Sequence, residues 1–414
     1  MKILHISTQD YGGAGIAAYR LHKAMQKYGL DSKMLVLNKK NDDDSVIRIM
    51  DSAFQGKITT TNKDNSLINT IQWYLMNVDL SVYPNRPQGL EIFTGTRTAV
   101  YWETIPEIIE ADIIHLHWVF GIFDYKRCMN VLKNKKIVWT LHDMNPFTGG
   151  CHYTSGCEKY KQICSACPQL GSNYENDLSN ENFITKKSIY EKLNISIVSL
   201  SNWLYECSSS SALFKHFKHF CIKNTHPKDV FFPLDKIALK NRFNLPDKKI
   251  ILFGAETLTS YRKGIIYFIE AINHLKNYKD QFILGLFGSN PIEFKGFETI
   301  NFGTVSNPKE MAVIYNLADI FVAPSLEDNL PNTVAESLLC GTPVVGFSTG
   351  GIKDMVEHLK TGYLVDGYDS IKLAEGIKYF LDKNSEDYQM QCRNSAIEMF
   401  DERKVVEEYL RVYE

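Results

Sequence analysis

The stretch PSLEDNLPNTVAESLLCGTPVVGFSTGG, residues 324–351, carries more structural information than any other part of the chain. A strand-like run, ADIFVAPS, leads into it, and the acidic pair Glu327 and Asp328 follows in a polar turn. The next residues have the spacing of an amphipathic helix, which a Gly-Thr-Pro tripeptide (341–343) ends before a second strand-like run. A strand, turn, helix and strand in this order predict one unit of a parallel sheet, whose ligands bind where the strands end.

The same alternation of strand-like and helical segments extends over the rest of the chain. The strands we predict are residues 2–7, 33–38, 111–119 and 135–143 in a first series, and 248–256, 281–288, 318–325 and 342–348 in a second. Such alternation is typical of parallel sheets covered by helices on both faces. We therefore predict an α/β protein with two Rossmann-like domains.

Prolines mark the expected boundary between the two series. Pro227, Pro233 and Pro246 lie in a less regular stretch that we interpret as a linker. A chain of 414 residues also exceeds what one hydrophobic core usually supports. From about Ser385 onward, polar residues with helical spacing are expected to pack back on the first domain. The predicted organisation is a domain over 1–222, a linker over 223–246, a second domain over 247–395 and a C-terminal helix over 396–414.

The overall composition argues against several classes of protein. The 46 Lys and Arg residues nearly balance the 48 Asp and Glu residues, so the net charge of −2 provides no basic field for nucleic acid. No apolar run approaches the roughly 18–20 residues that span a bilayer. The N-terminal residues read as a strand followed by polar residues rather than as a signal peptide. We expect a cytoplasmic, globular protein without a nucleic-acid partner.

A glycine-rich turn, STQDYGGAGIAAYRL, follows the first predicted strand. Gly12, Gly13 and Gly15 let the backbone approach a ligand, and the helix after them presents N–H groups to an anion. Gly13, Gly15 and Ala18 also fit a dinucleotide-binding pattern, but the next strand lacks the acidic residue that would hold a ribose. We predict a sugar or phosphate site at Gly12 and Gly13, with a simple tight turn as the alternative.

Two histidines alternate in HLHW, at the end of a predicted strand. Alternation places His115 and His117 on one face of the sheet and Leu116 on the other. A single histidine in a strand is usually a packed core residue. A pair at the carboxyl end, followed by Trp118, is better placed to line a pocket, where a neutral imidazole hydrogen-bonds a sugar hydroxyl.

In the second half, the helix after the acidic pair can bind phosphate through its N-terminal N–H groups, and Glu336 can accept both hydroxyls of a ribose. Capping of that helix by Asp328 or Asn329 is the alternative. The whole stretch resembles the donor-site signature of glycosyltransferase family 4, in which two acidic residues have seven residues between them. The GGAG loop, HLHW, TLHDMNPFTGGCHY, SYRKG and PVVGFSTGGIKDMV occur in the family's order, so the resemblance covers essentially the full chain.

This resemblance implies a GT-B fold, in which two Rossmann-like domains face a central cleft. It also implies transfer of a hexosyl group from a nucleotide-sugar donor, with retention of configuration and without a catalytic metal. The expected acceptor is a saccharide or a lipid-linked saccharide in surface polysaccharide assembly.

The resemblance further implies roles for individual residues of the C-terminal half. Glu336 would hold the ribose, and Asp328, at the first acidic position, would contact the donor sugar. Lys263 would neutralise the diphosphate as the bond to the anomeric carbon breaks, with Arg262 assisting.

Three more positions complete the predicted site. The backbone groups of Asn329 and Leu330 would face the sugar or phosphate, and His117 matches the family's histidine near the reacting centre. The predicted catalytic residues are therefore His117, Lys263, Asp328 and Glu336, and the donor-binding residues are Gly12, Gly13, Arg262, Lys263, Asn329, Leu330 and Glu336.

The chain departs from the family pattern at two places. The first acidic residue is Asp328 rather than a glutamate, and the adjacent Glu327 would give a spacing of eight. The basic residue that usually follows the strand before RKG is absent, because the sequence there reads Gly254, Ala255 and Glu256. Both departures concern the identity of the donor and the residues that clamp its phosphates.

Three other functions remain as alternatives. An NAD(P)-dependent oxidoreductase would share a doubly wound fold, although the acidic residue for the ribose is missing. A metal-dependent glycosyltransferase of another fold would use an Asp-x-Asp motif, and residues 42–44 offer one within a polar run interpreted as a solvated loop. A non-catalytic nucleotide-sugar-binding protein would bind the donor without turnover.

Four cysteines occur close together in CHYTSGCEKYKQICSACP, with His152 among them. Soft ligands at this spacing, ending in C-x-x-C, suit tetrahedral zinc. The predicted ligands are Cys151, Cys157, Cys164 and Cys167. Similar cysteines in a subset of the family that resembles polysaccharide-assembly enzymes imply a structural role. Reduced thiols packed in a loop are the alternative to a structural zinc.

A basic stretch, FKHFKHFCIKNTHPK (214–228), is the expected place of any peripheral contact with a membrane. If the acceptor is lipid-linked, these residues would touch anionic lipid at the inner face of the membrane. The alternative is a solvated face of a helix.

Overall fold

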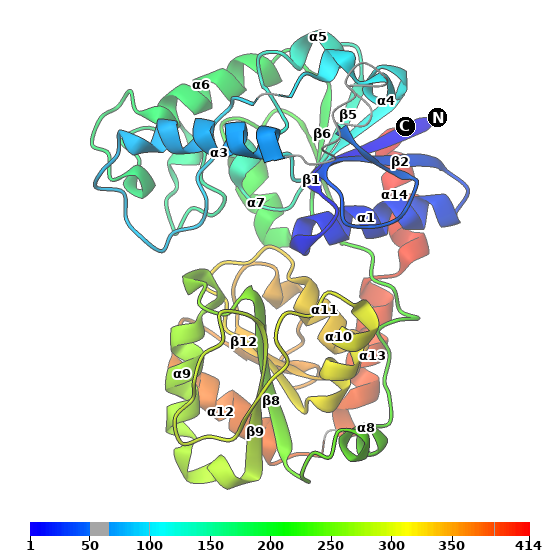
Figure 1. Cartoon of the computed structure of the whole chain (residues 1–414), viewed down its shortest axis with the longest axis vertical. Coiled ribbons are helices and arrows are strands. Elements are labelled where there is room, and N and C mark those ends of the chain that lie inside the picture. The colour runs from blue at the N-terminus through cyan, green and yellow to red at the C-terminus, as the bar shows by residue number, and fades with distance from the viewer. Residues whose placement is uncertain (50–65, 99, 385) are drawn as a thin grey trace. The chain divides into compact units, whose positions relative to one another are not determined.

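The computed structural model of the chain describes residues 1–49, 66–98, 100–384 and 386–414 (Figure 1). It divides into two compact units, one formed by Met1–Asn224 with Arg403–Glu414 and the other by Thr225–Glu402. Each unit contains one sheet whose paired strands all run parallel. The predicted α/β class with two Rossmann-like domains is therefore confirmed.

The sheet of the first unit has the strand order β3-β2-β1-β4-β5-β6-β7. Its strands are β1 (Lys2–Gln9), β2 (Asp31–Asn38), β3 (Val46–Arg48), β4 (Ile113–Leu116), β5 (Lys136–Leu141), β6 (Ile195–Ser199) and β7 (Lys218–Cys221). Its helices are α1 (Gly12–Lys27), α3 (Ser66–Ser81), α4 (Pro106–Glu110), α5 (Met129–Leu132), α6 (Leu178–Tyr190), α7 (Asn202–Ser210) and α14 (Glu402–Tyr413). Short 3-10 helices occur at Trp102–Thr104, Asn145–Phe147, Lys159–Lys161 and Pro168–Leu170.

Two apolar layers cover the faces of this sheet. On one face, Leu21 of α1 and Tyr409 of α14 pack against a cluster that includes Ile3 and Val138. On the other face, a larger cluster contains residues of α4 to α7 and the buried Trp139. The last residues of the chain thus complete the core of the first unit, because α14 supplies part of one layer.

The sheet of the second unit has the strand order β10-β9-β8-β11-β12-β13. Its strands are β8 (Lys249–Thr257), β9 (Phe282–Ser289), β10 (Thr299–Asn301), β11 (Ile320–Ala323), β12 (Val344–Phe347) and β13 (Gly362–Val365). Its helices are α8 (Lys236–Arg242), α9 (Ile265–His274), α10 (Pro308–Leu317), α11 (Asn332–Leu339), α12 (Ser370–Leu381) and α13 (Glu386–Met399), with 3-10 helices at Tyr261–Lys263, Lys276–Gln281 and Ile352–Asp354.

The boundaries of the units differ from the predicted ones in two places. Most of the predicted linker over 223–246 belongs to the second unit, because α8 lies within it and the backbone N–H of Leu234 donates to Asn316 Oδ1 over 2.6 Å. The helix predicted over 396–414 is the end of α13 followed by α14, which begins at Glu402.

The basic stretch 214–228 is not a helix. Its centre forms the edge strand β7, which pairs with β6, and Phe214 is buried in the larger apolar cluster. The interpretation as a solvated helix face is therefore wrong. None of the helices in the described residues combines the length and the apolar character that a membrane-spanning helix needs.

The contact of α14 with the first unit gives a prediction for stability. The hydroxyl of Tyr413 lies 2.6 Å from Nδ1 of the buried His115, so Tyr413→Phe leaves a buried nitrogen without this partner. We expect the free energy of unfolding to fall by about 1–3 kcal/mol in chemical denaturation. Tyr28→Phe, at an exposed tyrosine, is the control and should change little. Equal stability of both variants would contradict the assigned role of α14.

Candidate active site

In the second unit, the strand order changes direction between the neighbouring strands β8 and β11. The turn that carries Arg262 and Lys263 follows β8, and residues 324–331 follow β11. Ligands of open parallel sheets bind in the crevice at such a switch point. The sheet topology therefore brings together the two motifs that the sequence placed in one site.

Gly264 holds the two turns in close contact. It lies in the left-handed region (φ 72°), and an added Cβ would lie 1.8 Å from the carbonyl oxygen of Pro324. The backbone N–H of Leu326 also donates to the carbonyl oxygen of Arg262 over 2.8 Å. A side chain at position 264 would therefore push the two turns apart.

A second glycine contact holds the turn that carries Asp328. Gly350 has φ 53°, and an added Cβ would lie 1.8 Å from the carbonyl oxygen of Asp328. The same carbonyl accepts a hydrogen bond from the N–H of Gly351 over 2.9 Å. The backbone of Asp328 is thus held against the turn that follows β12.

The buried side chain of Asp328 forms a cluster of charges with two partly exposed cations of the turn after β8. It is 6% exposed, and its Oδ2 lies 2.5 Å from Lys263 Nζ and 3.5 Å from Arg262 Nη1. The hydroxyl of Ser325 lies 3.3 Å from the same oxygen. Burial acts to raise the pKa of Asp328, but the two cations and these hydrogen bonds lower it below its usual value. The carboxylate is therefore ionised at neutral pH.

Glu336 lies on α11 and is 7% exposed. The hydroxyl of Tyr315, at the end of α10, lies 3.1 Å from Glu336 Oε2. The sequence reasoning missed Tyr315, since no motif marks it. Pro331 is the N-cap of α11, so capping by Asp328 or Asn329, the alternative to a ligand site, is wrong.

Asn329 and Leu330 lie between the charge cluster and α11, and both are buried. The roles of their backbone groups in donor binding stay a prediction.

The absence of a basic residue at Gly254 has a steric reason, because an added Cβ there would lie 2.1 Å from the ring of Phe287. Without rearrangement of Phe287, a basic side chain does not fit at this position.

In the first unit, the switch point lies between β1 and β4. The glycine-rich turn follows β1, and HLHW ends β4. Gly12 has φ 68°, and Gly15 packs closely, because an added Cβ would lie 2.4 Å from the carbonyl oxygen of Gln9. Position 13 has space for a Cβ, with no neighbouring atom within 4 Å. Backbone conformation and packing thus explain Gly12 and Gly15, and the ligand role of Gly12 and Gly13 stays a prediction.

Of the three consecutive aspartates at residues 42–44, the middle one has structural partners. Asp43 lies 2.8 Å from Lys23 Nζ and accepts hydrogen bonds from Tyr19 and Ser45. Asp42 and Asp44 are exposed. These contacts give Asp43 a role within the loop after β2.

A row of buried histidines runs along one face of the first sheet. The rings of His115 and His117 stack with centroids 4.3 Å apart, as strand alternation predicts, and His5 on β1 is the register partner of His115. The ring nitrogens of these three histidines lie within 4.8 Å of one another. His115 already bonds the hydroxyls of Tyr413 and Thr140, so both of its nitrogens have protein partners.

His5, His117 and His142 form a chain of hydrogen bonds in which each ring donates to the next one. His5 Nε2 lies 3.3 Å from the sulfur of Met25, which only accepts, so this nitrogen carries the proton. His5 Nδ1 therefore accepts from His117 Nε2 over 2.9 Å, and His117 Nδ1 accepts from His142 Nε2 over 3.1 Å. Both nitrogens of His117 therefore have hydrogen-bond partners, and His142 stands at the outer end of the chain. The sequence analysis did not predict His142 as a site residue.

His117 and His142 line a pocket of about 430 Å³, part of which is open to solvent. Its wall combines aromatic rings, among them Trp118, with the polar side chain of Asp143. Trp118 Nε1 donates to Asp143 Oδ2 over 2.8 Å, and His152 Nδ1 lies 2.6 Å from the same oxygen. Concave, partly apolar sites with a few fixed polar groups are typical of small-molecule binding.

Comparisons with known proteins agree with this geometry. Residues 235–399 match the family model of the glycosyl transferases group 1. The chain is 24% identical over 369 residues to WcaC of Escherichia coli K12, whose description as a colanic acid biosynthesis glycosyl transferase is provisional; the match covers 86% of this chain and 85% of the relative.

Solved structures of two other proteins share the fold over the full chain. Sucrose-phosphate synthase from Thermosynechococcus elongatus has a TM-score of 0.65 at 18% identity, with 100% of this chain and 98% of that chain covered. HepE of Anabaena, solved with UDP and glucose, has a TM-score of 0.60 at 15% identity, with 100% and 99% covered.

The two parallel α/β units, the second with a cluster of charges at its switch point, have the GT-B fold of glycosyltransferases. Residues 235–399, which lie in the second unit, match the glycosyl transferases group 1, and the chain is similar over most of its length to a bacterial glycosyltransferase, in agreement with the family resemblance of its motifs. The alternative of a metal-dependent glycosyltransferase with another fold is therefore wrong.

The buried histidines predict that the stability of the protein depends on pH. Burial lowers the pKa of His22 and His142 to about 4 and that of His115 to about 3, from an ordinary 6.5. Below pH 6.5 the unfolded chain binds protons that the folded chain does not. The free energy of unfolding should therefore fall as the pH drops from 6.5 toward 4, by up to about 1.4 kcal/mol per pH unit for each histidine. Chemical denaturation at pH 7.5, 6.5 and 5.5 measures this slope, and an unchanged stability across this range would exclude neutral buried histidines.

Proposed function

We propose that the protein transfers a hexosyl group from a nucleoside diphosphate sugar to a saccharide acceptor, with retention at the anomeric carbon and without a catalytic metal. The observation that carries this proposal is the cluster of Lys263, Arg262 and the buried Asp328, in the turns at the switch point that precede the helix of Glu336. The name of WcaC, which refers to colanic acid biosynthesis, supports a role in surface polysaccharide assembly. HepE, solved with UDP and glucose, supports a nucleotide-sugar donor.

Without a donor, Asp328 is the counter-ion of Lys263. A diphosphate in the crevice carries more negative charge than one carboxylate, so it takes Lys263 and Arg262 as partners. The bond between the anomeric carbon and the phosphate oxygen then breaks, and its electron pair stays on the leaving diphosphate. The acceptor oxygen forms the new bond to the anomeric carbon and gives its proton to a phosphate oxygen. The two cations stabilise the charge that develops on the leaving group.

The acidic residues then hold the remainder of the donor. Asp328, released from Lys263, accepts hydrogen bonds from hydroxyls of the sugar. Glu336 is oriented by Tyr315, and its carboxylate accepts both hydroxyls of the ribose. In this proposal, backbone N–H groups at the start of α11 donate to the phosphate.

The pocket of the first unit is the proposed acceptor site. Trp118 offers an apolar surface beside the fixed carboxylate of Asp143, a combination that suits a saccharide. His117 contributes either by bonding a hydroxyl itself after His142 moves or by orienting His142 toward it. The acceptor is free or lipid-linked, and the protein acts in the cytoplasm, at the inner face of the membrane if the acceptor is lipid-linked.

Donor turnover with a panel of nucleotide sugars, UDP-glucose first, and of saccharide acceptors tests the proposal. Lys263→Ala should lower kcat about 10²- to 10³-fold, because it removes a charge that stabilises the leaving diphosphate. Glu336→Ala should mainly raise KM for the donor. Lys360→Ala, at an exposed lysine paired with Glu357, is the control and should leave turnover unchanged.

The alternative functions give different results in the same assay. A non-catalytic nucleotide-sugar-binding protein would bind the donor without turnover for any acceptor. Equal activity of Lys263→Ala and the wild-type protein would disprove the assigned role of the charge cluster, and an inverted anomeric configuration of the product would disprove retention.

A further inference from the structure

Residues 142–177, which connect β5 to α6, are all described and form no helix or strand longer than three-residue 3-10 turns. Connections longer than about 12–15 residues without secondary structure are uncommon in compact domains. This one is nevertheless tightly packed. An added Cβ at Gly149 would lie 2.4 Å from the carbonyl oxygen of Ser179, and one at Gly150 would lie 2.4 Å from the ring of Phe93. The segment is therefore held by packing and side-chain contacts rather than by backbone ladders.

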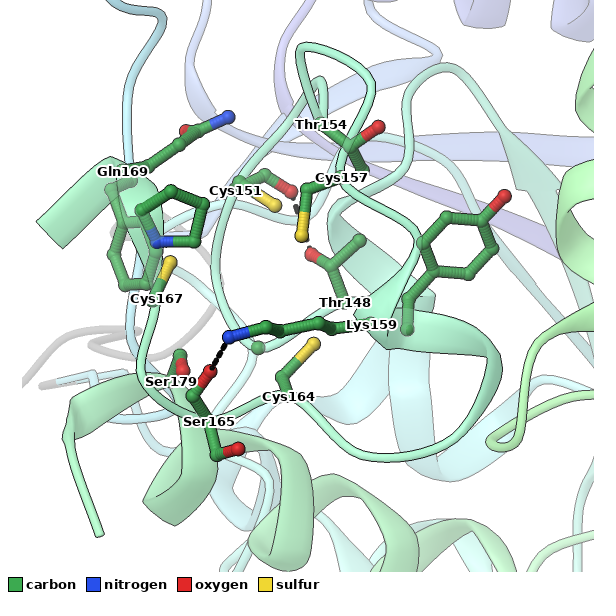
Figure 2. Close-up of a pocket in the computed structure, with 14 residues that line it drawn as sticks. Thr148, Cys151, Thr154, Cys157, Lys159, Cys164, Ser165, Cys167, Gln169 and Ser179 are labelled. Atoms are coloured by element: carbon green, nitrogen blue, oxygen red, sulfur yellow. Dashed lines mark hydrogen bonds between the residues drawn. The ribbon is translucent and has the colours of Figure 1, made fainter. Parts of the chain in front are cut away.

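The four cysteines of this segment face one hollow. Figure 2 shows their sulfur atoms around a pocket of about 350 Å³, with Lys159 beside them. The four thiols are free, and three of them are buried, while Cys157 lies partly exposed. His152 is not part of this group, since its ring bonds Asp143 and lines the other pocket. The residues around the hollow are thus Cys151, Cys157, Cys164 and Cys167.

Hydrogen bonds fix the backbone of three of these cysteines. The hydroxyl of Thr148 donates to the carbonyl oxygen of Cys151 over 2.6 Å, and Asn180 Nδ2 donates to that of Cys164 over 3.0 Å. The backbone N–H of Cys167 donates to Asp177 Oδ2 over 2.7 Å. The three cysteines are therefore held in place around the hollow.

A buried lysine lies next to the same sulfurs. Lys186 on α6 is fully buried, and its ammonium donates to the carbonyl oxygens of Asn145 and Thr148. Within the described residues, no carboxylate lies within 4 Å of this ammonium. Thr148 lines the hollow, so this ammonium lies directly behind the wall of the hollow. Buried charges are usually paired, and a zinc ion with four thiolates carries two negative charges that Lys186 and Lys159 would balance.

The turns that lead into two of the cysteines are strained. Ser155 and Ala166 have φ values of 51° and 41°, in the left-handed region that favours glycine, and they lie two residues before Cys157 and one residue before Cys167. Strained backbone of this kind persists where surrounding structure fixes it, often at ligand sites.

We propose that Cys151, Cys157, Cys164 and Cys167 bind one zinc ion, which cross-links the segment between β5 and α6. In the described residues, no three of the four sulfurs lie mutually within 4.8 Å, whereas a zinc tetrahedron needs about 3.8 Å between sulfurs. Binding therefore draws the sulfurs inward, and each thiol releases its proton to solvent. The inference does not depend on the proposed transferase reaction.

The zinc has a structural consequence for the neighbouring pocket. His152 directly follows Cys151, and its carbonyl oxygen accepts a hydrogen bond from the N–H of Met144 over 2.9 Å. Its ring holds Asp143, which fixes Trp118. The metal thus holds one wall of the proposed acceptor pocket while touching no substrate.

Elemental analysis of the full chain, expressed with zinc in the medium and purified without chelator or affinity tag, tests the proposal directly. We expect about one zinc per chain in the wild-type protein. The double variant Cys164→Ser with Cys167→Ser should lose the metal. Cys221→Ser, at an exposed cysteine far along the sequence from the cluster, is the control and should keep it.

Two further measurements keep the proposal testable if the double variant fails to fold. Replacement of zinc by Co²⁺ in the wild-type protein should give the visible absorption of a tetrahedral site and sulfur-to-metal charge transfer, and Cys157→Ser, at the partly exposed position, should change that spectrum. In competition with a chelator, Lys186→Met should weaken zinc binding about 10- to 100-fold, because it removes the charge that faces the thiolates.

Folded wild-type protein that contains no zinc and gives no such Co²⁺ spectrum would overturn the proposal. Equal zinc in the wild-type protein and the double variant would overturn it as well, because the ion would then be bound elsewhere. A disulfide between any two of the four cysteines, found by mass spectrometry under non-reducing conditions, would have the same effect.

Discussion

The contact between Lys263 and Asp328 is the interaction on which the second unit's site depends. Asp328 is buried and Lys263 partly exposed, and burying charges rarely adds net stability, because they lose hydration. Its retention at a switch point is therefore better explained by function than by folding. The two charges belong to turns after adjacent strands, and Gly264 and Gly350 hold these turns where no side chain would fit. The backbone thus positions the pair before any donor binds, which reduces the reorganisation that the reaction requires.

In the first unit, several polar imidazole rings are buried inside an apolar layer. His5, His117 and His142 bond one another in a chain that ends at the sulfur of Met25, and His115 bonds the hydroxyl of Thr140. The C-terminal helix α14 takes part in this, because Tyr413 bonds His115. Residues almost 300 positions apart in the sequence therefore stabilise the same strand.

Much of the fold followed from the sequence. The eight predicted strands exist, because their β-branched and apolar runs alternate clearly with helical segments. Within the described residues, the strands that were not predicted are β3, β6, β7, β10 and β13, which have three to five residues each. All of them except β6 lie at the edges of the sheets. Runs this short carry no periodic signal. The break between α13 and α14 was also missed, since helical spacing continues across it.

The predicted site was accurate where strand ends share a switch point, as with Lys263 and Asp328. It was incomplete where a contact crosses between helices or strands. Tyr315 reaches Glu336 from another helix, and His5 and His142 reach His117 from neighbouring strands or the turns after them. Pairing of this kind depends on register and packing, which no local pattern contains.

The central claim, that the second unit binds a nucleoside diphosphate through this cluster, is tested most directly by thermal unfolding with UDP, GDP, ADP and NAD. The account predicts that one nucleoside diphosphate, at about 100 times its Kd, raises the Tm by roughly 5 °C or more, and that Lys263→Ala loses most of this shift. Stabilisation by NAD alone, or a nucleotide shift that Lys263→Ala leaves intact, would contradict it.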